Sequence, residues 1–276
     1  MDFLDPLCSL NLRSVETALE LADLEGGLDG CRSKNWHPVN ILVPAYLNPT
    51  PLCPSKGRYF LIEDGSGELI PICSYHHRDK AFINSLIMEI YVNRLFMYEG
   101  MDFIMGAQGK RTGIDDLLHI LFNDIKKDGF KKAWDVWMKE NAVDCSALAI
   151  EAIRDALEMV YHNNTLIPDT NALSLGKYEG KYPYTEKVKT SVRPADMTDP
   201  CLELKPGDLC IIKDLPHTTV FLGRYREKKG DNTPYWIWAS TGKGKIAIFT
   251  HEEFRKAYKN DKEQAVSRWN LRNYNP

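Results

Sequence analysis

Two residues that lie far apart in the sequence have the side chains that amide hydrolysis by a thiol requires. Cys145, between Asp144 and Ser146, starts a segment whose apolar pattern predicts a helix to about Tyr161. A helix N-terminus offers free N–H groups and a partial positive charge, which stabilise a thiolate and an oxyanion. His217 begins an apolar run that predicts a strand, and an imidazole at a strand end can act as a general base toward a thiol. Each residue alone is also explained by a structural role, so the inference depends on both together.

A turn signal lies between these two residues and leads into another strand. Pro206-Gly207-Asp208-Leu209 combines a Pro-Gly turn with the start of an apolar run that ends near Lys213. The run that begins at His217 ends at Gly223. We therefore expect two adjacent buried strands, with His217 at the start of the second.

The three fragments together resemble the NlpC-type cysteine peptidases, the bacterial and phage branch of the papain-like fold that cuts peptidoglycan stem peptides. The resemblance rests on Asp-Cys-Ser around Cys145, on Pro-Gly-Asp-Leu from Pro206, and on the run from His217 to Gly223, and it covers roughly residues 96–250. It implies an α+β, papain-like NlpC-type domain with helices packed on an antiparallel sheet. It also implies that Cys145 is the nucleophile, that His217 is the base and then the acid, and that the substrate is a cell-wall peptide.

The chain departs from the family's pattern at the third catalytic position. The family has a polar residue, usually histidine, on the strand after the catalytic histidine, whereas Trp238 stands there in this sequence. An indole cannot accept a hydrogen bond from an imidazole N–H, so an orienting group has to come from elsewhere. Ser240, Thr241 and a backbone carbonyl are candidates, and a Cys-His dyad without an orienter is a further alternative. Gln108 is a candidate oxyanion donor. The candidates for lining the substrate cleft are Asp144, Ser146, Tyr178 and Trp238.

Periodicity and capping signals predict the elements that position these residues. Ser14 predicts the cap of a helix to about Glu25, and strands are expected over 39–43, 58–63 and 68–73. Helices are expected over 79–98, 112–126 and 130–140, ahead of the one that begins at Cys145. Further strands are expected over 208–213, 217–225, 235–239, 245–249 and 265–271, with a capping box from Thr250 to Glu253 starting one more helix. We therefore expect an α+β accessory region over 1–78 and the peptidase-like domain over 79–276, with a helical insertion at about 108–143.

Length and composition exclude several classes of protein. Of the 276 residues, 43% are hydrophobic and 26% are charged, which is ordinary for a globular protein and excludes disorder of the whole chain. The net charge of −3 argues against a general nucleic-acid binder. No apolar run is long enough to span a membrane. The acidic start, soon interrupted by proline, lacks the features of a secretory signal, so we expect synthesis in the cytoplasm without a signal peptide.

The seven cysteines form no recognisable set of disulfides or zinc ligands. Their number is odd, their spacing is irregular, and neither Cys-x-x-Cys nor His-Glu-x-x-His occurs. His76 and His77 are a tempting pair, but we expect no cysteine or carboxylate at the spacing that would complete a metal site with them. The sequence therefore predicts no metal and no cofactor, with most thiols buried as small apolar side chains.

The resemblance and the missing signal together imply a hydrolase of peptidoglycan peptides that is delivered to its target. We expect export by a specialised secretion system and a role as an antibacterial toxin, with an immunity protein as partner. Two alternatives stay open. One is an intracellular effector of the same fold that cleaves, deamidates or acyl-transfers on a host molecule, since all these reactions pass through a thioester. The other is a non-catalytic binding module, which Trp238 permits.

Overall fold

The chain folds into two compact units that are not continuous in sequence. One contains Met1–Ile87 and Ala156–Leu166, and the other contains Met88–Asp155 and Ile167–Asn275. Both combine helices with antiparallel sheets, so the fold belongs to the mixed α+β class that the sequence predicts. The computed structural model describes residues 5–28, 36–43, 45–64, 66–77, 79–103, 143–161, 167–178, 182–189, 193–213, 216–224, 232–260, 264–271 and 274. The expected helices over 112–126 and 130–140 lie outside these residues, as does the expected insertion apart from its last position.

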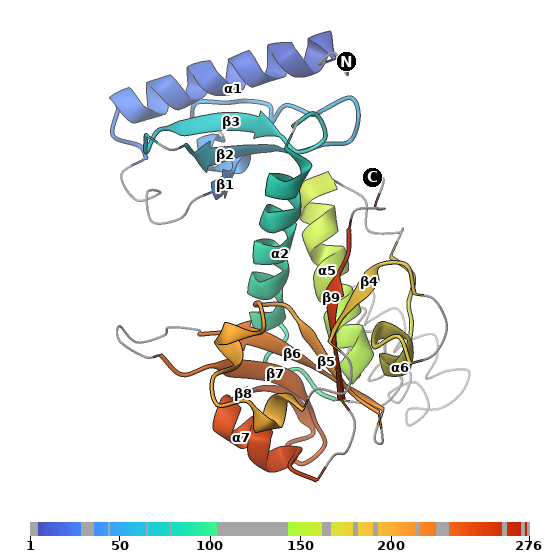
Figure 1. Ribbon diagram of the computed structural model, residues 1–276. Helices are drawn as coiled ribbons and strands as arrows, with labels where there is room; N and C mark the ends of the chain where they lie inside the picture. Colours follow the sequence, from blue (N-terminus) through green and yellow to red (C-terminus); the bar gives the residue numbers. More distant parts are fainter. Residues whose placement is uncertain are drawn as a thin grey trace, which may run out of the picture. The chain divides into compact units, whose positions relative to one another are not determined.

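The first unit is built on a helix and a three-stranded antiparallel sheet. Helix α1 (Pro6–Leu24) lies across the sheet, whose order is β1 (Trp36–Pro38), β2 (Tyr59–Glu63) and β3 (Leu69–Cys73) (Figure 1). The Asp5 carboxylate accepts a hydrogen bond from the backbone N–H of Leu7 at 2.8 Å, which caps the helix. One apolar core joins α1 to the sheet, because the buried face of the helix and the inward residues of the strands form a single cluster.

Two expectations for this unit are wrong. Helix α1 begins at Pro6, because a proline is well tolerated in the first turn, where its missing N–H has no partner to lose. Ser14 is not a cap, since its hydroxyl donates to the Leu10 carbonyl one turn earlier in the same helix. The residues expected as a strand over 39–43 form instead a short 3-10 helix, η1 (Val39–Leu42). Pro38, which has no N–H for a sheet ladder, ends β1 directly before it.

Two long helices contribute residues to both units. Helix α2 (Lys80–Phe96) begins after Asp79, whose carboxylate accepts hydrogen bonds from the first turn. Helix α5 (Cys145–Tyr161) begins after Asp144. Both confirm helices that the sequence predicts. Within the second unit, Arg94 of α2 pairs with Asp155 of α5 at 3.0 Å.

The second unit contains a six-stranded antiparallel sheet whose last strand in sequence lies inside it. Its strands are β4 (Thr185–Lys189), β5 (Leu209–Ile212), β6 (His217–Gly223), β7 (Tyr235–Ser240), β8 (Lys245–Thr250) and β9 (Gln264–Trp269). Their order is β4-β9-β5-β6-β7-β8, so β9 pairs with β4 on one side and β5 on the other. Strands β5 to β9 confirm the sequence predictions. Strand β4 is not among them, because its residues are mostly polar, as is common at a sheet edge.

The two faces of this sheet pack against different helices. Alternate side chains point to a core that helix α7 (His251–Ala257) covers, and they include Cys210, Ile212, Phe221, Trp236, Trp238, Phe249 and Val266. The predicted capping box of Thr250 and Glu253 starts this helix. The opposite face meets α2, where Tyr91 packs edge-on against Trp269 with ring centroids 6.0 Å apart. The segment over 163–200, expected to be irregular, contains β4 and the short helices α6 (Ala172–Leu175) and η2 (Pro194–Asp196), and η3 (Pro200–Leu202) begins at its last residue.

The Pro-Gly turn before β5 and the glycine that ends β6 pack against each other. Gly207 has a φ of +92° and Gly223 a φ of +78°, conformations that favour glycine. A Cβ atom on Gly223 would lie 2.8 Å from Cγ of Pro206. The Gly207 N–H donates to the Phe221 carbonyl at 2.7 Å, and the Phe221 N–H donates to the Asp208 carbonyl at 2.9 Å. The turn therefore fixes the register of β5 against β6, which sets the position of His217.

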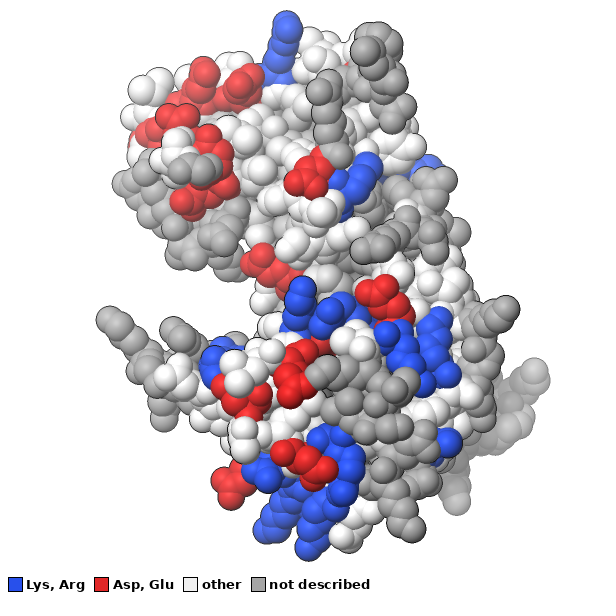
Figure 2. Space-filling view, in the orientation of Figure 1, with Lys and Arg blue, Asp and Glu red and all other residues white. Residues whose placement is uncertain are grey.

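The described surface carries both signs of charge. Figure 2 shows mainly acidic side chains on the visible face of the first unit, and basic and acidic side chains together on that of the second. Among the described helices, none has the length and apolar composition needed to cross a membrane.

Candidate active site

Cys145 is the first residue of α5, and Asp144 caps that helix. Oδ1 of Asp144 accepts hydrogen bonds from the backbone N–H groups of Ser146 at 2.9 Å and Ala147 at 2.7 Å. The Ser146 hydroxyl donates to the same oxygen at 2.9 Å. Asp144 and Ser146, both predicted to line a cleft, thus hold the start of the helix. The Asp144 carboxylate binds the N–H groups of Ser146 and Ala147, but it does not bind the N–H of Cys145.

The Cys145 sulfur lies against the beginning of β6. It is partly buried, and the nearby backbone N–H groups of Thr218, Ser146 and Cys145 favour its charged form. Burial outweighs these donors and raises the pKa of the Cys145 thiol to about 11, with the negative charge of Asp144 acting in the same direction. The helix N-terminus therefore does not by itself make this residue a thiolate, and the thiol is neutral at pH 7.

His217 directly precedes Thr218 on β6, so its backbone is next in sequence to the strand residue whose N–H lies near the Cys145 sulfur. His217 is 9% exposed, and its ring lies beside that of Tyr258 with centroids 6.1 Å apart. Burial lowers the pKa of the His217 imidazole to about 4, so the ring is neutral at pH 7 and can accept a proton. Within the described part of the chain, no hydrogen bond joins the His217 ring to the Cys145 sulfur. An approach of these atoms to within about 4 Å stays a prediction.

The two pKa values predict how the Cys145 thiol reacts with an alkylating agent. Because only the thiolate reacts and the pKa is about 11, the rate constant for iodoacetamide should rise by about 1000-fold between roughly pH 6 and pH 9. A thiolate–imidazolium pair would instead give a rate that is nearly flat over this range. Peptide mapping by mass spectrometry separates modification of Cys145 from that of Cys201, which is also partly buried. A flat profile for Cys145 would contradict the neutral pair.

Trp238 belongs to the hydrophobic core of the sheet. It is 5% exposed and stacks on Phe249 with ring centroids 3.7 Å apart. It pairs across the sheet with Thr219, which is two residues beyond His217. The position at which the resemblance leads one to expect a polar orienting residue is therefore used for apolar packing in this chain.

The other sequence-predicted site residues lie in different surroundings. Ser240 ends β7, and its hydroxyl accepts a hydrogen bond from the Lys243 N–H at 3.3 Å, while Thr241 is exposed in the following turn. Neither of these two described residues bonds to the His217 ring. Tyr178 follows α6, where the ammonium groups of Lys187 and Lys213 lie over its ring at 5.1 and 5.3 Å. Gln108 lies outside the described residues.

A second group of reactive side chains, which the sequence does not predict, lies in the first unit. Cys8, Cys53, Cys73 and His76 have their ligand atoms within 4.8 Å of one another. The expectation that no cysteine is placed to complete a site with His76 is therefore wrong. The spacing Cys73-x-x-His76 is the one local signal for this group, because Cys8 and Cys53 join it only through the fold.

Comparisons with known proteins do not assign this chain to a family. No protein-family model matches it. Neither the curated proteins nor the solved structures contain a match.

Proposed function

We propose that this protein is a cysteine-dependent amide hydrolase in which Cys145 is the nucleophile and His217 the general base. The observation that carries the proposal is the position of the Cys145 sulfur, which is close enough to the Thr218 backbone N–H for that donor to lower the pKa of the thiol. Cys145 begins a helix, and Thr218 directly follows a buried, neutral histidine, His217. The Thr218 hydroxyl is a second observation in support of a site here. It is fully buried and has no hydrogen-bond partner among the described residues, which is unusual for a buried polar group.

The neutral thiol and neutral imidazole define the order of proton transfers. The His217 imidazole takes the proton from the Cys145 thiol as sulfur attacks the carbonyl carbon of the substrate. The amine leaves with that proton when the C–N bond breaks, and a thioester to Cys145 remains. Water, deprotonated by His217, then hydrolyses the thioester and restores the thiol. The scheme requires the imidazole to come within hydrogen-bond distance of sulfur once substrate is bound, a contact that is often long or absent in free enzymes.

The helix N-terminus supplies a donor for the oxyanion. Of the N–H groups in the first turn of α5, those of Ser146 and Ala147 are bound by the Asp144 carboxylate. The Cys145 N–H is thus the group that can bind the substrate oxygen as negative charge develops on it. Asp144 contributes by holding the first turn in place.

The substrate class follows from the resemblance to the NlpC-type peptidases, whose papain-like fold we propose for the second unit. Two of its motifs support this, because Pro206 and Gly223 pack together and fix β5 against β6 beside Cys145. We propose that the substrate is a peptidoglycan stem peptide. In this proposal the protein is a toxin exported by a specialised secretion system and bound by an immunity protein.

A non-catalytic binding module is the second candidate, and two observations favour it. The described structure has no hydrogen bond between the Cys145 sulfur and the His217 ring, and Trp238 occupies the place of the orienting residue. In this case the thiol would be a buried side chain without an acid–base partner.

Hydrolysis of defined peptidoglycan fragments tests the proposal. The protein is incubated with purified muropeptides, and mass spectrometry follows the appearance of two products whose masses sum to substrate plus one water. His217→Gln, which removes the base while keeping similar size, should lower the rate by about 100- to 10,000-fold.

An electrophilic peptide ketone separates the candidates further. If Cys145 is labelled, Cys201 is not, and the labelling is lost in His217→Gln, the protein is an enzyme. If the muropeptides stay intact in that case, only the proposed substrate class is wrong. A wild-type protein that neither cleaves fragments nor reacts at Cys145 is the outcome that the binding module predicts.

A further inference from the structure

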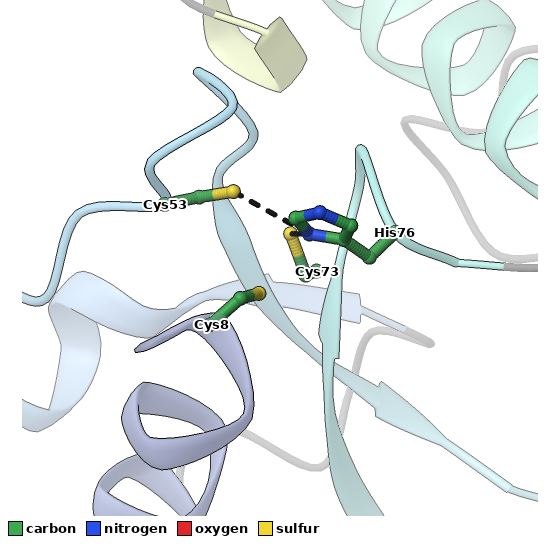
Figure 3. Close-up of side chains that lie close together, drawn as sticks. All are labelled: Cys8, Cys53, Cys73 and His76. Carbon is green, nitrogen blue, oxygen red and sulfur yellow. Dashed lines mark hydrogen bonds between the residues drawn. The ribbon is translucent and has the colours of Figure 1, made fainter. Parts of the chain in front are cut away.

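The four side chains of the second group come from separate parts of the first unit and converge on one point (Figure 3). Cys8 lies in the first turn of α1, Cys53 in the turn before β2, Cys73 at the end of β3, and His76 in the turn that follows. The three cysteines are buried and have free thiols, and His76 is partly buried. Nδ1 of His76 lies 3.6 Å from the Cys53 sulfur and 3.5 Å from the Cys73 sulfur.

The two sulfur–nitrogen distances agree with those of a tetrahedral zinc site. With Zn–S bonds of about 2.3 Å and a Zn–N bond of about 2.05 Å, tetrahedral geometry puts sulfur and nitrogen about 3.6 Å apart. Both measured distances from Nδ1 of His76 agree with this value. The donor set, three sulfurs and one imidazole nitrogen, is one of the sets that close structural zinc sites use.

Neighbouring residues make hydrogen bonds to the four side chains, as residues around a metal site do to the metal's ligands. The backbone N–H of His76 donates a hydrogen bond to the Cys73 sulfur. The Tyr59 hydroxyl donates to the Cys8 sulfur at 3.3 Å, and Asn11 donates to the oxygen of Tyr59 at 3.2 Å. Such bonds hold metal-bound thiolates in position and balance part of their charge.

Gly57 provides the space for this arrangement. A Cβ atom there would lie 2.9 Å from the Cys73 sulfur, so any larger residue would press on the cluster. Core packing explains buried thiols, and thiol–imidazole hydrogen bonds would give the same two distances, so the observation that favours a metal is that four ligand atoms lie within 4.8 Å of one another.

We propose that Cys8, Cys53, Cys73 and His76 bind one Zn²⁺ ion that ties α1, the turn before β2 and the end of β3 together. Binding replaces the protons of the three thiols and uses a neutral imidazole, so it releases protons and involves no oxidation. All four coordination positions are filled by protein, which makes the site structural and leaves no position for a substrate. The site is independent of Cys145 and His217.

Metal analysis of the full chain, purified without chelator from zinc-containing medium, is the first test. We expect one zinc per chain by inductively coupled plasma mass spectrometry. Replacement by cobalt should give the d–d absorption of a tetrahedral site together with thiolate-to-cobalt charge transfer. A chain that contains no zinc after exposure and dialysis, or a cobalt complex without thiolate bands, overturns the proposal. So does a disulfide between any two of the three cysteines, detected by peptide mapping of the protein as purified.

Matched variants locate the metal. Cys73→Ser and His76→Asn should each lower the zinc affinity by about 100-fold or more. His77→Asn, the neighbouring histidine, and Cys201→Ser, a thiol of the second unit, should keep one zinc per chain, as should Cys145→Ala. If Cys73→Ser does not fold, the cobalt spectrum of the wild-type protein still decides, because thiolate bands at one equivalent of cobalt require this cysteine-rich site. Zinc that persists in His76→Asn but disappears in Cys145→Ala would show that the metal lies elsewhere and would overturn the proposal.

Discussion

Replacing Cys145 with alanine is expected to abolish hydrolysis while leaving the protein folded. The proposed reaction needs a sulfur to form the thioester, and loss of a covalent nucleophile typically lowers kcat by about 10⁴-fold or more. The cost to stability should be small, about 1 kcal/mol, because the side chain is partly buried and the polar groups beside its sulfur are backbone N–H groups. Turnover of muropeptides and thermal unfolding of the same preparation measure the two effects.

Cys201→Ser is the matched control for this substitution. Cys201 is also a free, partly buried thiol of the second unit, and it has no place in the proposed site. Its variant should turn over at the wild-type rate. If Cys145→Ala retains comparable turnover, Cys145 is not the nucleophile and the mechanism is wrong.

The second large effect is expected for Asp208→Ala, and it concerns stability. The Asp208 side chain is 2% exposed, and its two oxygens accept hydrogen bonds from Arg268 at 2.6 and 2.7 Å. The Lys205 N–H donates to the same carboxylate at 2.8 Å. Its removal takes the bidentate carboxylate partner from the partly buried Arg268 guanidinium, leaves Glu186 as its acidic neighbour across the sheet, and releases the turn before β5. We expect a loss of about 3–5 kcal/mol in the free energy of unfolding, measured by denaturant titration.

An exposed ion pair provides the comparison for Asp208. Asp196 lies 3.5 Å from Arg193, and its side chain is 64% exposed. Asp196→Ala should therefore cost less than about 1 kcal/mol, because solvent screens the pair. Equal effects of the two substitutions would show that burial of Asp208 does not determine its contribution.

The sequence predicts the elements of this protein where a local pattern is sufficient. Alternating or continuous apolar runs predict β5 to β9, and the capping box of Thr250 and Glu253 predicts the start of α7. Local signals mislead where one residue type serves two purposes. Pro6 occupies the first turn of α1, yet the same proline can also interrupt a helix. Polar β4 carries no strand signal, because its place at the sheet edge is decided by its pairing with β9.

The two groups of reactive side chains also differ in how much of each a local sequence pattern can predict. Cys145 and His217 each stand at the start of an element that periodicity identifies, so the sequence predicts where they lie along the chain. The distance between the Cys145 sulfur and the His217 ring depends on side-chain packing around Tyr258 and Thr218. Sequence periodicity carries no information about this packing. Cys8 and Cys53 meet Cys73 only because α1 and the turn before β2 fold onto the end of β3. Spacing rules detect ligands that are close in sequence, and in this group only Cys73 and His76 are.

The interior position of β9 has a consequence for how the second unit is made. Strands β5 to β8 pair with sequence neighbours and can form as soon as they leave the ribosome, whereas β4 has to wait while four further strands are synthesised. Until β9 arrives, β5 keeps an open edge that can pair with another chain. Long-range pairing of this kind is slow, because a long loop has to close before the contacts form. Insertion of β9 is therefore the closing step of folding in this unit, and the nascent chain is most exposed to aggregation just before it.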